Sequence, residues 1–330
     1  MTAPDDRRPP GELHGFYGRL KEEFPSQLIL DITEVCNLAC IHCPHPAFAK
    51  SPHYAARKLD PALNAKLVDE TRAHGKGLTQ YIRYTSNGEP TAHPECFEMI
   101  EYAVRNSGTT VTLTTNGKTL NANRAERLLA TGVHVVDISL DAYSPETYAK
   151  VRVKGDLTVV RPQVADLIRR ARDRGGQTKV VVSYIEQPAN AHETAEFERY
   201  WNDHGADYVV IRRLHSCSGA KVDLAMQRRA AAPPRRPCLY PWERMVLTAR
   251  GDLAFCPSDW VHGSVVADYR TTTIRETWNG EYYRRLRAAH LTNDFNGFGF
   301  CAQCPDWQAT RWPDAGRSYA DMVDEFKATE

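Results

Sequence analysis

Short apolar segments alternate with longer helical stretches along most of the chain. The apolar segments predict strands at residues 27–33, 79–85, 110–115, 134–140, 178–185 and 207–214. The stretches that follow them predict helices at residues 61–74, 94–106, 122–131, 145–151, 158–174 and 192–204. Such alternation requires a parallel sheet whose working loops lie at the carboxyl ends of the strands. Because six units are too few to close an eight-stranded barrel, we predict an α/β fold built on a partial (βα)₆ barrel.

The pattern changes after residue 225. Residues 226–237 are basic and rich in proline, which predicts a linker with solvated arginines. Residues 245–256 then predict a β-hairpin with Arg250-Gly251-Asp252 at its turn, and residues 264–286 lead into a helix. We therefore divide the chain into a disordered leader (1–24), the barrel (25–225), the linker (226–237), a small second domain (238–310) and a C-terminal tail with a polar helix (311–330).

The charges of the chain are almost balanced, with 42 Lys and Arg against 41 Asp and Glu. No global field therefore indicates a nucleic-acid or membrane partner. No apolar run reaches the ~18 residues of a transmembrane helix, and the N-terminus lacks the apolar core of a signal peptide. Nine cysteines in such a chain indicate thiolate chemistry in a reducing cytoplasm rather than disulfides.

Three cysteines directly follow the first predicted strand with the spacing C-x₃-C-x₂-C, at Cys36, Cys40 and Cys43. Three thiolates in one loop leave a four-iron cluster one ligand short, so one iron keeps an open site. A zinc knuckle or buried structural thiols are the alternatives. Since zinc sites usually pair cysteines as C-x₂₋₄-C with a distant second pair, the spacing favours the cluster.

Four further cysteines lie in the predicted small domain, at Cys238, Cys256, Cys301 and Cys304. Four thiolates complete a second [4Fe–4S] cluster that has no open site. They also fit a structural Cys₄ zinc site. Their chemistry alone leaves both alternatives open.

The two cysteine sets together resemble a known enzyme family. The C-x₃-C-x₂-C loop resembles the signature of radical SAM enzymes, whose open iron holds the amino and carboxylate groups of S-adenosylmethionine (SAM). The second set resembles the SPASM/twitch extension of these enzymes, through the segments Cys238-Leu239-Tyr240-Pro241-Trp242, Ile274–Asn279 and Cys301-x₂-Cys304-x₂-Trp307. No cysteine follows Cys304, so the resemblance is to the shorter twitch form with one auxiliary [4Fe–4S] cluster. It covers residues 27–310 and implies a reductant such as flavodoxin or ferredoxin.

The resemblance also implies a SAM pocket. Asn87-Gly88-Glu89-Pro90 follows the second strand and resembles the GGE motif, which holds the methionyl ammonium; alone, the segment would be an ordinary surface turn. The other implied SAM contacts are His42 near the adenine, Thr115, Asn116, Ser139 and Asp141 at the ribose and methionyl carboxylate, and Arg152 on that carboxylate.

Twitch enzymes with a fully cysteine-ligated cluster include the alcohol dehydrogenase and sugar epimerases of aminoglycoside antibiotic pathways. The resemblance therefore implies that a 5′-deoxyadenosyl radical removes hydrogen from a carbinol carbon of a sugar, aminocyclitol or nucleoside-type intermediate. The short leader favours such a small substrate over a peptide. Epimerisation, oxidation to a ketone with the auxiliary cluster as electron acceptor, 1,2-diol dehydration and maturation of a ribosomal peptide remain alternatives, as does a metal-binding module without catalysis.

Two cysteines belong to neither set. Cys96 is expected to be a small buried hydrophobe, whereas Cys217 follows the sixth strand and would lie at the rim of the barrel. A thiol at that rim can return hydrogen to the opposite face of a substrate carbon, which favours epimerisation; a structural thiol is an equal alternative. Glu186, Arg212 and Arg213, near strand ends, are expected to hold hydroxyl and amino groups or to act as the base.

Overall fold

A computed structural model describes residues 23–85, 87–223 and 235–309 of the chain. The predicted leader, the first part of the linker and the polar C-terminal helix lie outside these residues. Within them, no helix is long and apolar enough to cross a membrane.

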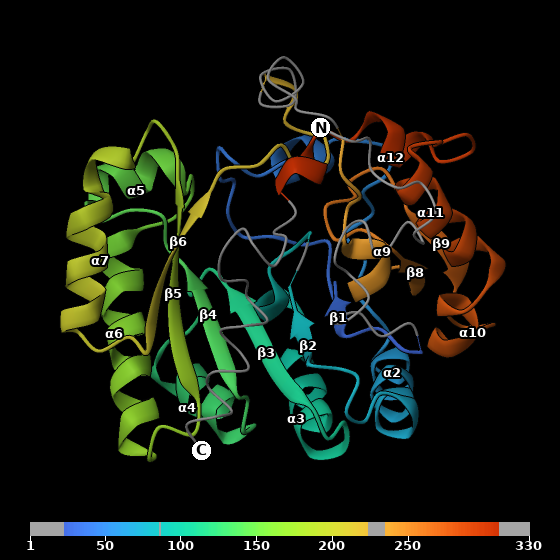
Figure 1. Cartoon of the computed structure of the whole chain (residues 1–330). Coiled ribbons are helices and arrows are strands. Elements are labelled where there is room, and N and C mark those ends of the chain that lie inside the picture. The colour runs from blue at the N-terminus through green and yellow to red at the C-terminus, as the bar shows by residue number, and fades with distance from the viewer. Residues whose placement is uncertain (1–22, 86, 224–234, 310–330) are drawn as a thin grey trace, which may run out of the picture.

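The barrel half of the molecule is a curved sheet of six parallel strands. Neighbouring strands pair in the order β6-β5-β4-β3-β2-β1, so all six predicted strands and the parallel topology are confirmed. Figure 1 shows the sheet opening toward the viewer. The strands are β1 (Gln27–Leu30), β2 (Tyr81–Tyr84), β3 (Thr110–Thr115), β4 (Val135–Ser139), β5 (Lys179–Glu186) and β6 (Tyr208–Arg213).

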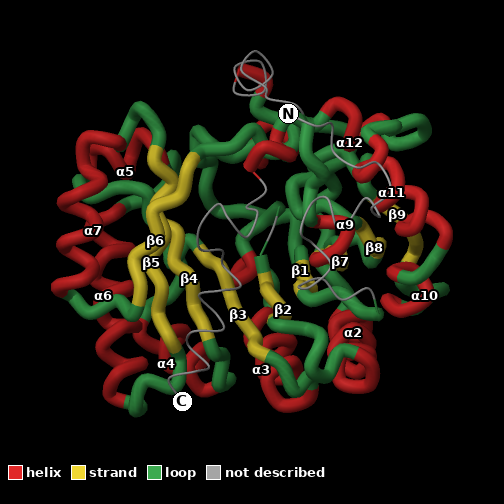
Figure 2. Tube along the Cα trace, viewed as in Figure 1, coloured by secondary structure: helices red, strands yellow, loops and turns green. Residues whose placement is uncertain are grey.

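Helices follow the strands and cover the outer face of the sheet (Figures 1 and 2). Several begin where the sequence supplies a capping side chain: Asp60, Asn121, Ser144 and Asp156 each accept a hydrogen bond from a backbone N–H of the first turn. The predicted helices are confirmed as α2 (Pro61–His74), α3 (Cys96–Asn106), α4 (Ala122–Ala130), α5 (Pro145–Val151), α6 (Leu157–Asp173) and α7 (Thr194–Asp203). Shorter elements are α1 (His45–Phe48), η2 (Pro90–Ala92) and η3 (Ala191–Glu193).

The two faces of the sheet differ in chemistry. Outward-facing residues such as Leu28 and Ile82 are fully buried in the main apolar core beneath the helices. The inner face carries a polar layer around Asp137 on β4. Its carboxylate accepts hydrogen bonds from Arg83 (3.1 Å), from Arg212 (2.8 Å) and from the hydroxyl of Ser183 (2.5 Å). The interior of the barrel is therefore charged and hydrogen-bonded rather than apolar.

The C-terminal half joins the same sheet. β7 (Arg244–Leu247) pairs in parallel with β1, and β8 (Asp252–Ala254) and β9 (Val265–Asp268) continue antiparallel from it, giving nine strands in all. The predicted hairpin is confirmed, with Gly251 in the left-handed region at its turn (φ 87°). Around the strands lie α9 (Tyr240–Glu243), α10 (Ile274–Trp278), α11 (Glu281–Thr292), α12 (Gly299–Gln303) and η4 (Asp306–Ala309).

Candidate active site

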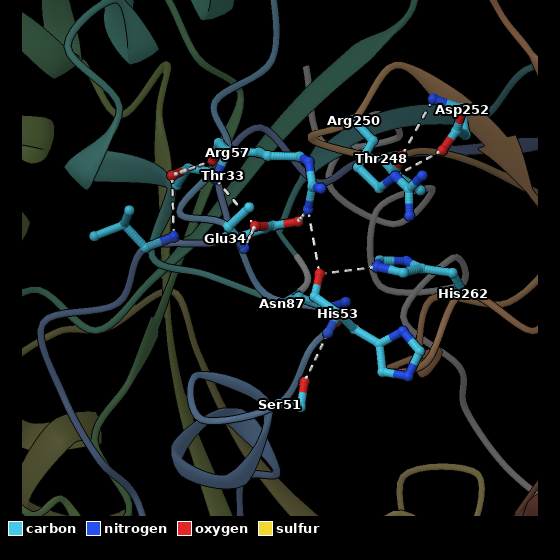
Figure 3. Close-up of polar contacts among 12 residues, drawn as sticks. Thr33, Glu34, Ser51, His53, Arg57, Asn87, Thr248, Arg250, Asp252 and His262 are labelled. Atoms are coloured by element: carbon cyan, nitrogen blue, oxygen red, sulfur yellow. Dashed lines mark hydrogen bonds and ion pairs between the residues drawn. The ribbon is translucent and has the colours of Figure 1, made fainter.

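The first cysteine set lies in the loop that leaves the carboxyl end of β1. Glu34 anchors this loop: its carboxylate accepts hydrogen bonds from the backbone N–H of Ala55 (2.9 Å) and Arg57 (3.0 Å) and pairs with the Arg57 guanidinium (3.1 Å). Figure 3 shows Glu34 and Arg57 facing each other beside Thr33. On the far side of the loop, the Sγ of Cys43 accepts a hydrogen bond from the N–H of His45 (3.4 Å). The loop is thus held at both ends.

The middle of the loop pairs with the chain that leaves α5. The N–H of Ala39 donates to the carbonyl of Val153 (2.9 Å), and the N–H of Ile41 donates to the carbonyl of Val151 (3.0 Å). Cys40 is buried between these two hydrogen bonds. The cysteine loop therefore has a fixed backbone on which its thiols are displayed.

The three thiols are neighbours, with Cys40 buried and Cys36 and Cys43 half-buried. Burial raises the pKa of Cys36 to about 11 and also raises the pKa of Cys40 and Cys43. The Cys40 thiol raises the pKa of Cys36 and Cys43 further, whereas Arg152 lowers the pKa of Cys36 and Cys40. Buried thiols of this kind become thiolates when a metal supplies the compensating positive charge.

The loop after β2 packs against the first cysteine loop. A side chain at Gly88 would collide with the carbonyl oxygen of Thr33 and come within 2.8 Å of that of Val35. The N–H of Glu89 donates to the same Val35 carbonyl (2.9 Å). Only glycine allows this close approach of the two backbones. The buried Glu89 carboxylate then accepts hydrogen bonds from the hydroxyl of Thr115 (2.6 Å) and the N–H of Asn116 (2.8 Å). It joins the carboxyl ends of β2 and β3.

A second polar group lies beyond β4. Asp141, fully buried, pairs with Arg152 (2.5 Å) and lies 3.5 Å from the Nε2 of His42. Burial lowers the pKa of His42 to about 4 despite the nearby Asp141 carboxylate, so its ring is neutral. Asp141 has a left-handed backbone (φ 60°), which aspartate tolerates better than most residues. Ser139 is the last residue of β4, two residues before Asp141.

The second cysteine set is gathered from three segments of the C-terminal half. Cys238 precedes α9, Cys256 follows β8, and Cys301 and Cys304 lie in and directly after α12. Burial raises the pKa of Cys256, Cys301 and Cys304, and the thiols of Cys238 and Cys304 raise the pKa of Cys256 and Cys301 further. The four thiols therefore share one buried region.

Arg235 lies against this second set. Its guanidinium donates to the carbonyl of Cys301 (2.8 Å) and lies 3.9 Å from the centre of the Phe295 ring. It lowers the pKa of Cys301 and Cys304. The prediction of solvated linker arginines was therefore wrong for Arg235, because the end of the linker folds onto the cysteines. Arg228 and Arg229 lie outside the described residues.

The loop after β6 lies between the two cysteine sets. Cys217 is close enough to Cys43 to raise its pKa, whereas the hydroxyl of the next residue, Ser218, lies 3.5 Å from the Sγ of Cys256. Both residues have left-handed backbones, with φ of 52° and 57°. Two consecutive left-handed residues other than glycine are sterically costly, so the surrounding structure must hold them.

Asp306, two residues after Cys304, holds this loop. Its carboxylate accepts hydrogen bonds from the N–H of Ser216 (3.0 Å) and of Ser218 (2.7 Å) and lies 3.7 Å from His215. Burial disfavours a charged His215, but Asp306 and the Cys217 thiol outweigh it and raise the pKa of His215 to about 10. The segment that carries the second cysteine set thereby fixes the backbone around Cys217.

A cavity lies where the barrel meets the β7–β8 hairpin. Asp31, Glu34 and Asn87 line it from the barrel, and Cys256 and His262 line it from the C-terminal half. Figure 3 shows its polar rim, including the hydrogen bond of 3.2 Å between His262 and the carbonyl of His53. Burial raises the pKa of Asp31 well above its usual range, although hydrogen bonds from the backbone of Asn87 and Gly88 lower it.

The residues expected to meet substrate do not all lie on one face. Arg212 points to the inner face of the barrel, where it pairs with Asp137 (2.8 Å). Arg213 on β6 and Glu186 on β5 lie opposite each other, and both are exposed. The Glu186 carboxylate accepts a hydrogen bond from the hydroxyl of Thr194 (2.8 Å) at the start of α7. Cys96 is buried in the main core, as predicted. Of the three polar candidates, the arrangement favours Arg212.

Two family models match this architecture. That of the radical SAM superfamily matches residues 30–197 of the 330, and that of an iron–sulfur cluster-binding domain, SPASM, matches residues 238–305. The chain belongs to the radical SAM superfamily. Radical SAM domains bind SAM and a [4Fe–4S] cluster, and a SPASM domain adds an auxiliary cluster; radical SAM enzymes also need a reductant. Both parts of the family resemblance are thereby confirmed.

Curated relatives of this radical SAM chain include peptide-modifying enzymes. The mycofactocin maturase MftC of Mycolicibacterium smegmatis is 27% identical over 250 residues, which cover 74% of this chain and 58% of the relative. The PqqA peptide cyclase of Ruegeria pomeroyi is 27% identical over 250 residues, covering 74% of this chain and 61% of the cyclase. The chain thus spans about three fifths of these relatives.

Solved structures share the fold. The structure of BtrN in complex with AdoMet and 2-DOIA has a TM-score of 0.57 at 16% identity and covers 86% of this chain and 94% of BtrN. Streptococcus suis SuiB bound to its precursor peptide SuiA has a TM-score of 0.63 at 13% identity and covers 98% of this chain and 80% of SuiB. At such low identity these similarities show the fold alone.

The residues of this radical SAM chain fit the implied cofactors. Each cysteine set brings buried and half-buried thiols together. Arg152 has a buried Nε without a hydrogen-bond partner within the described residues, beside Asp141 and near Cys40. Within those residues no three or more His, Cys, Asp or Glu side chains are arranged around a single metal ion. The donor sets consist of cysteine thiols, which iron–sulfur clusters require.

Sequence reasoning missed several residues that shape the site. Ser218 and Arg235 contact the second cysteine set, and Asp306 and His215 contact the β6 loop beside it, only because the β6 loop, the linker end and α12 fold together. No spacing signal in the sequence marks them. The one available hint was the position of Asp306 two residues after Cys304.

Proposed function

We propose that this radical SAM enzyme removes a hydrogen atom from a secondary carbinol carbon of a small polyhydroxylated substrate and inverts that carbon. The substrate class is a sugar, aminocyclitol or nucleoside-type intermediate. The observation that carries the proposal is the place of Cys217, between the two cysteine sets at the carboxyl end of the barrel. In this proposal the barrel comprises residues 25–225 and the auxiliary-cluster unit residues 238–310.

The cofactor ligands follow from the same arrangement. Cys36, Cys40 and Cys43 hold the first cluster, and Cys238, Cys256, Cys301 and Cys304 hold the auxiliary cluster. Bound SAM and the first cluster together supply a 5′-deoxyadenosyl radical that abstracts hydrogen. The SAM contacts are the loop Asn87–Glu89, with Thr115, Asn116, Ser139, Asp141, Arg152 and His42 around it. Arg212 on the inner face of the barrel holds substrate hydroxyl or amino groups.

Cys217 completes the reaction as hydrogen donor. A substrate carbon that has lost one hydrogen atom on one face takes one from the thiol S–H on the other face, so the substrate is inverted with no net oxidation. The Cys217 sulfur is then short of one hydrogen atom. One electron and one proton restore the thiol, the electron coming from the external reductant that also starts the next turnover. Asp306 and His215 hold the loop that presents Cys217.

Turnover in D₂O tests this proposal. The Cys217 thiol exchanges with solvent, so candidate aminocyclitols or amino sugars should acquire one deuterium at the inverted carbon. The Cys217→Ala enzyme should still convert SAM to 5′-deoxyadenosine but lose inversion at least ~100-fold, because no donor remains. Cys96→Ala removes a cysteine that is buried in the main core and belongs to neither cysteine set, and is the matched control. If the parent enzyme forms a ketone and Cys217→Ala forms it at the same rate, the reaction is oxidation rather than epimerisation. The auxiliary cluster would then accept the electron.

Peptide modification is a second candidate, favoured by the similarity to MftC, to the PqqA peptide cyclase and to the SuiB fold. Incubation with a precursor peptide encoded beside the gene separates the two. A mass change in the peptide that needs SAM and reductant would favour this candidate. No change in the peptide, together with turnover of a small polyol, would leave the first proposal standing.

A further inference from the structure

The tip of the first cysteine loop is exposed. Ile41 follows Cys40 and has 43% of its surface exposed, whereas Cys40 and His42 on either side are buried. An isolated exposed isoleucine would need no explanation. Ile41 is not isolated, because exposed apolar residues also lie on the segments that hydrogen-bond to its loop.

Two more exposed apolar side chains lie on segments that hydrogen-bond to the cysteine loop. Val153 is 37% exposed and belongs to the segment that hydrogen-bonds to the cysteine loop. Val222 is 63% exposed and follows Lys221, whose Nζ donates to the carbonyl of Ile41 (2.6 Å). Five large apolar side chains are exposed among the described residues, and three of them lie on these hydrogen-bonded segments. We call Ile41, Val153 and Val222 the Ile41 patch.

Lysines surround the Ile41 patch. Lys118 donates to the carbonyls of Lys154 (2.7 Å) and Asn37 (3.4 Å), which places its ammonium beside the loop. The Nζ of Lys221 lies on the Ile41 carbonyl, and Lys154 is exposed and directly follows Val153. Asp223, exposed, follows Val222, and the carboxylate of Asp156 caps Thr158. The local charge is positive in a chain whose net charge is only +1.

From this arrangement we infer that the Ile41 patch is the docking surface for an acidic electron-carrier protein of the flavodoxin or ferredoxin class. An apolar centre with a charged rim is the anatomy of a specific interface, and a small one suits a transient redox partner. The basic rim steers an acidic carrier to the place where the cluster loop reaches the surface. One electron passes from the reduced carrier to the first cluster, and no bond is formed or broken.

Reductive cleavage of SAM by the reconstituted enzyme tests this inference, because it can be driven by reduced flavodoxin or by dithionite. The Lys154→Glu variant should lose about tenfold or more in rate at sub-saturating flavodoxin and keep its rate with dithionite, which needs no docking surface. Lys76→Glu is the matched control: Lys76 is equally exposed but precedes β2, at the opposite end of the barrel. Added salt should slow the flavodoxin reaction of the parent enzyme and affect Lys154→Glu less.

A second variant tests the apolar centre. Val153→Asp should weaken the flavodoxin reaction in the same selective way, while Val261→Asp, at an exposed valine of the C-terminal half, should not. Unchanged flavodoxin-driven rates in both Lys154→Glu and Val153→Asp would overturn the inference. Equal losses with flavodoxin and dithionite would also overturn it, because these residues would then support the cysteine loop rather than a partner.

Discussion

The two cysteine sets of this molecule are built in opposite ways. Cys36, Cys40 and Cys43 come from one loop whose backbone is held by Glu34 and by the segment after α5. The second set, from Cys238 to Cys304, comes from three separate segments that meet only when β7–β9 and α9–α12 are in place. The first set depends on local chain geometry, and the second depends on the tertiary fold of the C-terminal half.

Their surroundings differ as well. Arg152 lowers the pKa of Cys36 and Cys40 in the first set, and Arg235 lowers the pKa of Cys301 and Cys304 in the second. The second set alone has a side-chain hydroxyl near a thiol among the contacts of the described residues, that of Ser218 at 3.5 Å from Cys256. Replacing a single cysteine of the first set should therefore remove the first cluster. Small changes around the second set should instead shift the midpoint potential of the auxiliary cluster.

The largest expected effect separates the two sets directly. Cys36→Ala leaves two thiolates for the first cluster, so reductive SAM cleavage should fall below detection. Cys256→Ala should retain part of that cleavage while losing substrate turnover, because the first loop does not depend on it. Iron analysis after anaerobic reconstitution should give about eight irons in the parent protein and about four in each variant. About four irons and one zinc in the parent would contradict the assignment of the second set.

A smaller effect is expected from Gly88→Ala, which acts on the first set alone. The added methyl group collides with the backbone of Thr33 and Val35, and displaces the Glu89 loop from the cysteine loop. SAM cleavage should fall about tenfold or more, and stability should decrease by about 1–3 kcal/mol. Gly299→Ala, where a side chain meets no neighbouring atom, is the control. Iron content of the second set should not change; equal damage to both sets would mean that they fold as one unit.

The smallest effect concerns Ser218, near the second set. Loss of its hydroxyl in Ser218→Ala removes a hydrogen bond to a ligating sulfur, which should shift the midpoint potential of the auxiliary cluster to more negative values by an amount on the order of tens of millivolts. Ser218→Gly also lacks the hydroxyl but tolerates the left-handed backbone (φ 57°), and should shift the potential to the same extent. A redox titration followed by electron paramagnetic resonance measures both clusters. A shift in the midpoint potential of the first cluster instead would show that the loop after β6 acts through Cys217.

The same contrast separates what could be predicted from what could not. The strands and helices of the barrel followed from apolar periodicity and capping residues, and the first cysteine loop followed from its spacing after β1. The hairpin at Gly251 was predicted from its turn residues. In contrast, the parallel pairing of β7 with β1 joins residues far apart in the chain, and no local pattern encodes it.

The sequence by itself therefore determined the barrel, the three-cysteine loop and the family, because each depends on residues that are neighbours in the chain. Only the tertiary structure decided that Arg235 lies on the second cysteine set, that Arg212 faces the interior while Glu186 and Arg213 are exposed, and that Asp306 holds the loop of Cys217. The physical reason is that these contacts join segments that meet only after chain folding, where burial and hydrogen-bond satisfaction select the partner and sequence spacing carries no signal.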